Sequence, residues 1–486
     1  MESRIAIFSK LVRDCMRTLP LALEEGTSLG DVVRQMEAAG ASSATVIDAE
    51  GRPIGIITER DITRRAAFKL HSGDPVEEVM TAPVLTIQED EYLYYAIARM
   101  RRQGLRHMPV IDGERWLVGM LNLHDALATA SETLMGQIDI LTRDESLDGL
   151  KTIKAAQVEL ADQLLAENMP ATEIQALLTH INNDIYRRVV NLSLSDMEFD
   201  GMGKPPVDFC VIVMGSGGRG ENFLYPDQDN GLILEDYPDD RHTEIDAWFI
   251  ELGERMCRGL DQVGLPLCKG FVMATNPLWR KTLSQWKEQV ALWSHRRGVT
   301  ALRLCDIFFD FRTAWGEPDM ADELRHFVTE TASGNPAFLR DMYEDDVEHM
   351  VALGWFGRLL TEKEDEDFKG RINLKHTGTL PLVEAMRLLA FRDGIKAIST
   401  LERMDALKDK GVLNADEHDY LSGAFRHISH LLLRQQVADF KAGEKVSNFV
   451  HPDTLSERER DMLVDSFKAI RALRAKVKSE FTGDVF

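Results

Sequence analysis

The 486-residue chain has few cysteines, no excess of basic residues and no long apolar run. Its five cysteines never form a Cys-x-x-Cys pair, which argues against a disulfide framework and against a structural zinc site. Lysine and arginine number 57 against 80 aspartate and glutamate, so the net charge of −23 would repel nucleic acids and anionic membranes. No apolar stretch approaches the ~18 residues that a membrane-spanning helix needs. We therefore expect a cytoplasmic protein that binds neither nucleic acid nor membrane.

Hydrophobic residues make up 44% of the chain and charged residues 28%, a composition typical of folded soluble proteins. An internal repeat occupies the first 130 residues, where four positions recur with an offset of 64: Val46, Asp48, Gly55 and Asp61 return as Val110, Asp112, Gly119 and Asp125. Each copy shows, after an extended segment, the pattern of a helix, two short strands and a second helix. The two copies cover about residues 15–70 and 76–130.

The most specific part of the repeat lies where the second strand meets the following helix. The segments are GIITERD at residues 55–61 and GMLNLHD at residues 119–125. Thr58 and Asn122 are well placed to cap that helix, but capping alone does not explain a duplication of the whole unit. Both segments resemble the G-h-h-[ST]-x-x-D signature of CBS domains.

This resemblance implies that residues 1–130 form a tandem CBS domain pair with clefts for an adenine nucleotide. Asp61 and Asp125 would contact ribose hydroxyls, and Thr58 would lie near the phosphates. Asn122 stands where the family usually has Ser or Thr, which places the second cleft in doubt. CBS pairs often dimerise, so a homodimer formed through this pair is also expected.

The next segment, residues 131–200, shows no strand-like alternation. Its apolar residues recur at helical spacing, namely Leu147, Leu150, Ile153, Val158, Leu160 and Leu164. The pattern predicts a helical connector between two modules. Such a connector could transmit a conformational change from a sensor to an effector, or it could serve as a spacer, and the sequence favours neither.

A glycine-rich turn follows the apolar run at residues 207–214, which predicts a strand. The turn has the sequence GSGGRG at residues 215–220. Backbone N–H groups can approach a phosphate closely where no Cβ intervenes. The Ser216 hydroxyl can donate a hydrogen bond to the same phosphates. The Arg219 guanidinium can donate two parallel hydrogen bonds to them. The pattern predicts a phosphate-binding turn made by Gly215, Ser216, Gly217 and Arg219.

Two aspartates, Asp227 and Asp229, head a second apolar run at residues 231–234. Side chains two positions apart in extended chain project to the same side, so these carboxylates should lie together. Neighbouring carboxylates repel, and both stay ionised most readily when a divalent cation lies between them. The pair therefore predicts a site for Mg²⁺ or Mn²⁺, of the kind that assists nucleotidyl transfer from a nucleoside triphosphate.

Ten residues separate Ser216 from Asp227, and at this spacing the two motifs resemble the signature of the nucleotidyltransferase superfamily. More closely, GSGGRGENFLYPDQDN resembles the N-terminal catalytic motif of PII uridylyltransferases and their CBS-linked relatives. Residues 201–318 should then form a mixed-sheet nucleotidyltransferase domain. The polar Gln228 and Asn230 depart from the apolar positions of the wider superfamily but fit the linked subgroup.

The superfamily also needs a third acid on a later strand, and residues 302–312 offer Asp306 and Asp310. We favour Asp310, because its sequence FDFR at residues 309–312 resembles the D-x-R run of the uridylyltransferases. Asp306 stays open as the alternative third acid. Otherwise it would be a helix cap or part of a surface ion pair. The resemblance thus assigns catalysis and metal binding to Asp227, Asp229 and Asp310.

Beyond the sheet region, the apolar spacing from residue 319 to residue 486 is helical nearly throughout and predicts a bundle. Residues 373–387, NLKHTGTLPLVEAMR, resemble the substrate-binding helical domain that accompanies this nucleotidyltransferase subgroup. Lys375 and Arg387 could contact the nucleotide's phosphates or an acidic acceptor, but solvated positions on the bundle surface are preferred. For Asn276 and Arg280, structural roles in a turn are preferred over contact with a nucleotide.

The sequence as a whole predicts a multidomain α/β and α+β bacterial signalling protein with four parts: CBS pair, helical connector, nucleotidyltransferase domain and helical bundle. The resemblance implies a Mg²⁺-dependent enzyme that passes a nucleoside monophosphate from an NTP to a PII-like protein. An adenine nucleotide at the CBS pair would regulate it. Two alternatives stay open, a non-catalytic nucleotide-responsive binding protein and a transferase that modifies a small molecule.

Overall fold

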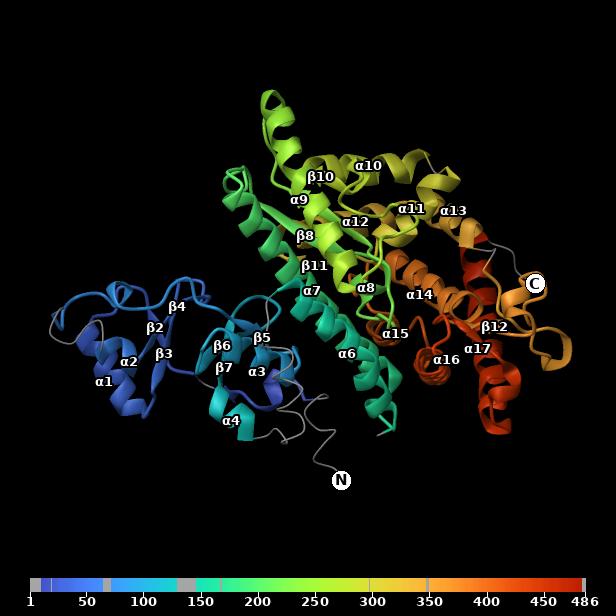
Figure 1. Cartoon of the computed structure of the whole chain (residues 1–486), viewed down its shortest axis with the longest axis horizontal. Helices are drawn as coiled ribbons and strands as arrows, with labels where there is room; N and C mark the ends of the chain where they lie inside the picture. Colours follow the sequence, from blue (N-terminus) through green and yellow to red (C-terminus); the bar gives the residue numbers. More distant parts are fainter. Residues whose placement is uncertain are drawn as a thin grey trace. The chain divides into compact units, whose positions relative to one another are not determined.

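The computed structural model describes residues 10–18, 20–63, 71–128, 146–166, 168–296, 298–346 and 349–482. The chain divides into two compact units, residues 1–145 and residues 146–486. The first unit holds the repeat that the sequence predicts. The second holds a sheet and most of the helices (Figure 1).

The first copy of the repeat is a three-stranded sheet with two helices. Its elements are β2 (Ala22–Glu24), α1 (Leu29–Ala39), β3 (Ser43–Ile47), β4 (Pro53–Thr58) and α2 (Glu59–Asp61). The strand order is β2-β3-β4, with β2 parallel and β4 antiparallel to β3. Helix α1 is amphipathic and is capped by Ser28, whose side chain accepts from the Asp31 amide. It buries Val32 against Val46 and Ile57 of the strands.

The second copy repeats this arrangement and adds one strand from the chain's beginning. Its elements are β5 (Ile87–Gln88), α3 (Leu93–Arg102), β6 (His107–Ile111), β7 (Leu117–Asn122) and α4 (Leu123–Ala128). Strand β1 (Arg17–Thr18) pairs antiparallel with β7, which gives the order β1-β7-β6-β5. The predicted order of helix, strand, strand and helix is confirmed in both copies.

The second unit begins with two long helices, α6 (Leu147–Ala166) and α7 (Ala171–Phe199). Both pack against α9 (His242–Val263), and α7 also contacts strand β11 (Arg312–Trp315). Of the predicted connector, residues 131–145 lie outside the described residues. Residues 147–166 and 171–199 are helical, as predicted, and belong to the same compact unit as the sheet.

The sheet of the second unit is mixed, as expected for the predicted domain. Its other strands are β8 (Phe209–Val213), β9 (Asn230–Leu234) and β10 (Arg280–Thr282), in the order β10-β9-β8-β11. Strands β9 and β10 are parallel, whereas β8 is antiparallel to both of its neighbours. Strand β8 is buried along its whole length and β9 likewise, so neither alternates between apolar and polar residues.

One sequence prediction about this region is wrong. Residues 302–312 were expected to form a strand. Most of them instead belong to helix α11 (Val299–Phe308), and strand β11 begins only at Arg312. The buried Leu302, Cys305 and Phe308 are three residues apart, which is helical spacing. Helix α10 (Leu283–Arg296) precedes α11, and the glycine-rich turn itself forms the one-turn helix α8 (Gly215–Arg219).

The remainder of the chain is the predicted bundle, drawn mainly in orange and red in Figure 1. Its helices are α12 (Asp319–Ser333), α13 (Pro336–Asp346), α14 (Leu380–Arg392), α15 (Thr400–Asp409), α16 (Ala415–Lys441) and α17 (Glu457–Thr482). A short π-helix, η8 (Lys375–Thr379), precedes α14. The bundle also contains a small antiparallel ribbon that the sequence did not predict, made by β12 (Ile372–Asn373) and β13 (Phe449–Val450).

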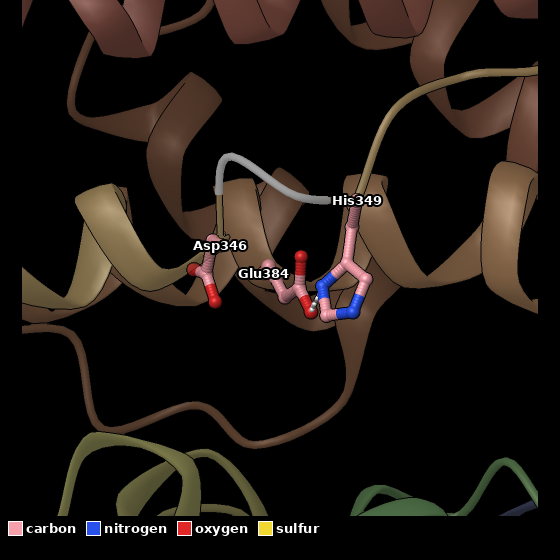
Figure 2. Close-up of side chains that lie close together, drawn as sticks. All are labelled: Asp346, His349 and Glu384. Atoms are coloured by element: carbon pink, nitrogen blue, oxygen red, sulfur yellow. Dashed lines mark ion pairs between the residues drawn. The ribbon is translucent and has the colours of Figure 1, made fainter. Parts of the chain in front are cut away.

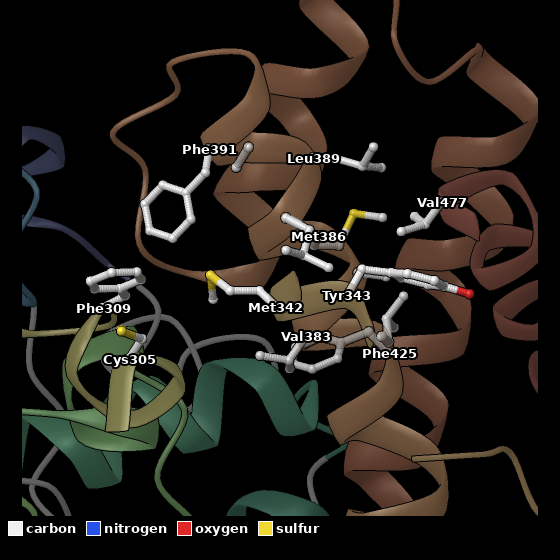
Figure 3. Packing of buried hydrophobic residues seen from close by; sticks show 14 of the residues in the cluster. Cys305, Phe309, Met342, Tyr343, Val383, Met386, Leu389, Phe391, Phe425 and Val477 are labelled. Carbon is white, nitrogen blue, oxygen red and sulfur yellow. The ribbon is translucent and has the colours of Figure 1, made fainter. Parts of the chain in front are cut away.

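The sheet and the bundle share one hydrophobic core. It runs from Cys210 and Ile212 in β8 to Val477 in α17. Figure 3 shows its middle part, where Phe309 packs beside α13 and α14. Burial of this continuous apolar surface fixes the bundle against the edge of the domain that carries the predicted site. Among the described residues, no helix is both long and apolar enough to cross a membrane.

Candidate nucleotide and metal site

The glycine-rich turn and the aspartate pair meet at the ends of two neighbouring strands. Strands β8 and β9 pair so that Val213 lies opposite Asn230, and the Met214 amide donates to the Asp229 carbonyl over 2.9 Å. Gly215 follows with a φ of +58°, a left-handed conformation that favours glycine. A Cβ at this position would lie 3.3 Å from Asp229 Oδ2. The structure therefore brings the two predicted motifs together.

The aspartate pair lies partly in solvent, with Asp227 exposed and Asp229 half-buried. Burial raises the pKa of Asp229 to about 6, and the negative charge of Asp227 adds to the effect. A hydrogen bond from Cys268 and the positive charges of Lys375 and Arg219 act in the opposite direction. A positive charge placed between the two carboxylates would lower the pKa of Asp229 and favour its ionised form.

The residues that follow each of the two aspartates, Gln228 and Asn230, are buried and held by hydrogen bonds. Gln228 is fully buried, and its amide nitrogen donates to the carbonyls of Cys257 over 2.9 Å and Leu265 over 2.7 Å. Asn230 is equally buried, and its side-chain oxygen accepts from the Ala274 amide over 2.9 Å. These polar side chains fix the segment that carries Asp227 and Asp229 to helix α9 and to the loop after α9.

Two further side chains of the predicted phosphate turn already have partners within the protein. The Ser216 hydroxyl donates to Asn222 Oδ1 over 3.1 Å. Arg219 forms ion pairs with Glu221 over 2.6 Å and with Asp310 over 2.8 Å. Contact of either side chain with a phosphate therefore stays a prediction, and for Arg219 it would require new geometry.

Asp310 lies at the centre of a buried arginine cluster. Its side chain is fully buried, and it accepts from Arg403 over 2.6 Å, from Arg219 over 2.8 Å and from Arg387 over 3.2 Å. Burial alone would raise the pKa of Asp310. Instead the three guanidinium groups, Arg403 first among them, hold that pKa well below its usual range.

This environment favours a positioning role for Asp310. Both of its carboxylate oxygens are taken by arginines that come from α8, α14 and α15. The aspartate thereby joins the glycine-rich turn to two helices of the bundle. Metal binding by Asp310 stays a prediction, and we propose positioning as its alternative role. Arg403 was missed by sequence reasoning, since no local motif marks it.

Of the remaining candidates, three have structural contacts and one is exposed near the aspartate pair. Arg387 is buried and pairs with Asp306 over 3.1 Å, so it is not the solvated surface cation that the sequence preferred. Arg280 donates to Asp246 and to the Ala274 carbonyl, a structural role as expected. Asn276, also as expected, caps the short helix η5 (Pro277–Trp279). Lys375, by contrast, is exposed and close enough to Asp229 for its charge to act there.

Gly218 gives a direct test of the contact between the turn and Asp310. A Cβ at Gly218 would lie 1.8 Å from the Asp310 carbonyl oxygen, whereas one at Gly217 would meet nothing closer than 3.6 Å. We expect Gly218→Ala to lower the free energy of unfolding by about 1–3 kcal/mol, because backbone must move. Gly217→Ala is the matched control with little expected change. Urea unfolding measures both, and equal effects would contradict the packing described.

In the first unit, the predicted CBS residues contact other groups of the same unit. Thr58 and Asp61 form a reciprocal capping box, in which Asp61 Oδ2 accepts from the Thr58 amide over 3.1 Å. Asp125 pairs with Arg17 over 2.7 Å, and Asn122 lies opposite His107 in the β6–β7 pairing. Nucleotide contacts by these four residues stay predictions.

The glycine of each CBS signature makes room for a methionine. A Cβ at Gly55 would lie 2.2 Å from Met80 Sδ, and one at Gly119 would lie 2.4 Å from Met16 Sδ. The two copies therefore use the same position in the same way. This equivalence supports the reading of the repeat as two copies of one fold.

Three family models match the chain. Residues 12–67 and 76–132 match the "CBS domain". Residues 155–299 match "Putative nucleotidyltransferase DUF294", a match that begins within α6. Residues 336–481 match "Putative nucleotidyltransferase substrate binding domain". The predicted boundaries at residues 200 and 318 stay predictions.

Known relatives resemble short parts of the chain. It is 30% identical over 99 residues to an uncharacterized protein of Methanopyrus kandleri, covering 20% of this chain and 50% of that protein. It is 29% identical over 123 residues to the A-adding tRNA nucleotidyltransferase of Aquifex aeolicus, covering 25% and 15%. The chain thus spans at most half the length of these two curated relatives.

Among solved structures, a CBS domain protein from Pyrobaculum aerophilum complexed with AMP is 22% identical, with a TM-score of 0.24. That similarity covers 26% of this chain and 98% of the other. The three family matches, in their order along the chain, agree with the architecture that the sequence predicts. The chain therefore belongs to the proteins that join a CBS domain pair to a DUF294 nucleotidyltransferase domain and its C-terminal substrate-binding domain.

Proposed function

We propose that this protein is a Mg²⁺- or Mn²⁺-dependent nucleotidyltransferase that passes a nucleoside monophosphate from an NTP to an acceptor hydroxyl. The observation that carries the proposal is the meeting of the Gly215 turn with Asp227 and Asp229 at the ends of β8 and β9. The family match over residues 155–299 supports it.

In this proposal each part of the site has one task. Asp227 and Asp229 would hold the divalent cation, which would neutralise charge on the triphosphate. Backbone amides around Gly215 and Gly217 would contact phosphate oxygens, because the turn has no Cβ at these positions. Lys375 would add a positive charge on the bundle side of the site.

The reaction requires one bond to form and one to break. The acceptor oxygen bonds to the α-phosphorus, the bond from that phosphorus to the bridging oxygen breaks, and pyrophosphate leaves. The acceptor's hydroxyl proton is lost to water. The chain's contribution is to orient the triphosphate and to stabilise its charge, which is most of what phosphoryl-group transfer asks of a protein.

For the acceptor we propose a small PII-like regulatory protein, on the resemblance of residues 215–230 to PII uridylyltransferases. The experiment supplies full-length protein with each α-³²P-labelled NTP in turn, Mg²⁺, and a lysate as the source of acceptors. Label should enter a small protein with one NTP, and EDTA should prevent transfer. Label in a metabolite would shift the proposal to a small-molecule acceptor, and no transfer with any NTP would refute it.

We further propose that the CBS pair binds an adenine nucleotide and thereby regulates the transferase. Asp61→Asn should weaken AMP binding to the full chain about tenfold, since a carboxylate that accepts from ribose hydroxyls is lost. The amide oxygen can still cap the Thr58 amide, so the fold should survive. Asp125→Asn should have the smaller effect, because Asn122 departs from the signature. Isothermal titration calorimetry measures both variants, and unchanged binding by Asp61→Asn would contradict the assignment.

A further inference from the structure

Acidic side chains from three helices converge at a second place in the bundle region. Asp306 comes from α11, Asp346 from the last residue of α13 and Glu384 from α14, and His349 joins them just after α13. One ligand atom from each of Asp346, His349 and Glu384 lies within 4.8 Å of the others. Figure 2 shows the two carboxylates and the imidazole facing one another.

The carboxylates of this cluster are buried without enough donors. Asp346 is 1% exposed, and neither of its carboxylate oxygens has a hydrogen-bond partner. Glu384 is 2% exposed, and its Oε2 also lacks a hydrogen-bond partner. A buried carboxylate without a hydrogen-bond donor costs several kcal/mol, so the Asp346 carboxylate in particular needs an explanation.

The arginines nearby bring positive charge but donate no hydrogen bond to the Asp346 carboxylate. Arg474 Nη1 lies 3.7 Å from Glu384 Oε2, which is an ion-pair distance but too long for a hydrogen bond. Its Nη2 donates to the main-chain carbonyl of Asp346 rather than to the carboxylate. Arg387 pairs with Asp306 and is shared with Asp310.

Asp306 adds to the same imbalance. Its negative charge acts on Asp346, and the charge of Glu384 acts on Asp306, so three carboxylates repel one another in this buried place. His349 supplies a nitrogen ligand, with Nδ1 2.8 Å from Glu384 Oε1. The His376 ring packs perpendicular to the His349 ring, with centroids 4.7 Å apart, and so restrains its orientation.

We propose that Asp346, His349 and Glu384 bind a divalent transition-metal ion of the Zn²⁺ class. One nitrogen and two carboxylate oxygens are ligands that Zn²⁺ accepts at about 2.0–2.2 Å. Ligand atoms around such an ion lie at most about 4 Å apart, so the 4.8 Å limit requires only a small closing movement. Asp306 would then lie beside the ligand shell and accept hydrogen bonds from it.

An ion here would join α13 to α14 and hold the end of α11. It would also fix the surroundings of Arg387, which contacts both Asp306 and the carboxylate of Asp310. The site is thus a structural cross-link of the bundle, and it does not depend on the transfer reaction. Its loss should lower the stability of the second unit.

The test uses the full chain, freed of metal with EDTA, returned to metal-free buffer and then given Zn²⁺ alone. Bound zinc is counted by mass spectrometry after desalting, and unfolding is followed by calorimetry. Wild type should retain one zinc ion that Asp346→Asn and His349→Gln each lose. Zinc should raise the Tm of wild type by about 4 °C or more and leave the Tm of both variants unchanged.

Two further variants keep the result unambiguous. Asp227→Asn should retain the ion, which separates this site from the Asp227 and Asp229 pair. His326→Gln removes an exposed histidine of α12 and should also retain it. In EDTA, Asp346→Asn should be at least as stable as wild type, because the substitution removes a buried charge. Equal zinc retention by wild type and Asp346→Asn, or none by wild type, would overturn the proposal and leave a shared proton between Asp306 and Asp346 as the explanation.

Discussion

Replacing Asp227 by asparagine is expected to lower the rate of nucleotidyl transfer about a thousandfold and to leave folding stability nearly unchanged. The carboxylate would lose its charge at the place where the divalent cation neutralises the triphosphate, and such electrostatic contributions are large in catalytic sites. The side chain is exposed, so its replacement removes no packing. Initial rates with saturating NTP, measured beside urea unfolding curves, give both quantities.

The matched control for this variant is Asp240→Asn. Asp240 is another exposed aspartate, in the short helix η4 (Asp239–Arg241), and it belongs to no predicted site. It should keep the wild-type rate. A loss of activity in Asp227→Asn smaller than tenfold would remove Asp227 from the proposed site.

Replacing Asp310 by asparagine is expected to destabilise the second unit by about 3–5 kcal/mol, since removal of one partner of a buried ion pair leaves the other charges uncompensated. Arg403 would lose its carboxylate partner in a site that excludes water, whereas Arg219 would keep Glu221 and Arg387 would keep Asp306. Urea unfolding of the full chain, followed by tryptophan fluorescence, measures the loss. Tryptophans such as Trp279 and Trp286 lie in the core of this unit.

This variant also separates the two roles considered for Asp310. If Asp310→Asn weakens metal binding but hardly changes the free energy of unfolding, the result supports metal binding by Asp310, the role that the resemblance assigned. A large loss of stability supports the positioning role. Arg403→Met is the companion variant, and it should cost less than Asp310→Asn because Asp310 would keep two arginine partners.

Much of the architecture was predictable because its signals are local. The repeat at an offset of 64 and the strand patterns of residues 43–58 and 107–122 each depend on residues close together in sequence. The glycine turn and the aspartate pair were also predictable, since one hairpin, β8 and β9, brings them together. Local periodicity and short-range pairing are enough for such features.

The errors and omissions arise where contacts join distant segments. Residues 302–308 are apolar enough to fit a buried strand or a buried helix, and the helix is stabilised by packing in the shared core. Asp310 meets Arg387 and Arg403 across 77 and 93 residues of chain, a contact that no local pattern specifies. The cluster of Asp346, His349 and Glu384 likewise exists only once α13 and α14 pack together.

The most direct measurement of the central claim is pyrophosphate release by the full-length protein, with Mg²⁺, the effective NTP and a desalted lysate as acceptor. Wild type is expected to release pyrophosphate in step with the label transferred, and Asp227→Asn is expected to release almost none. If wild type binds the NTP in the presence of Mg²⁺ but releases no pyrophosphate with or without added AMP, the transferase proposal is contradicted. The chain would then be a nucleotide-responsive binding protein.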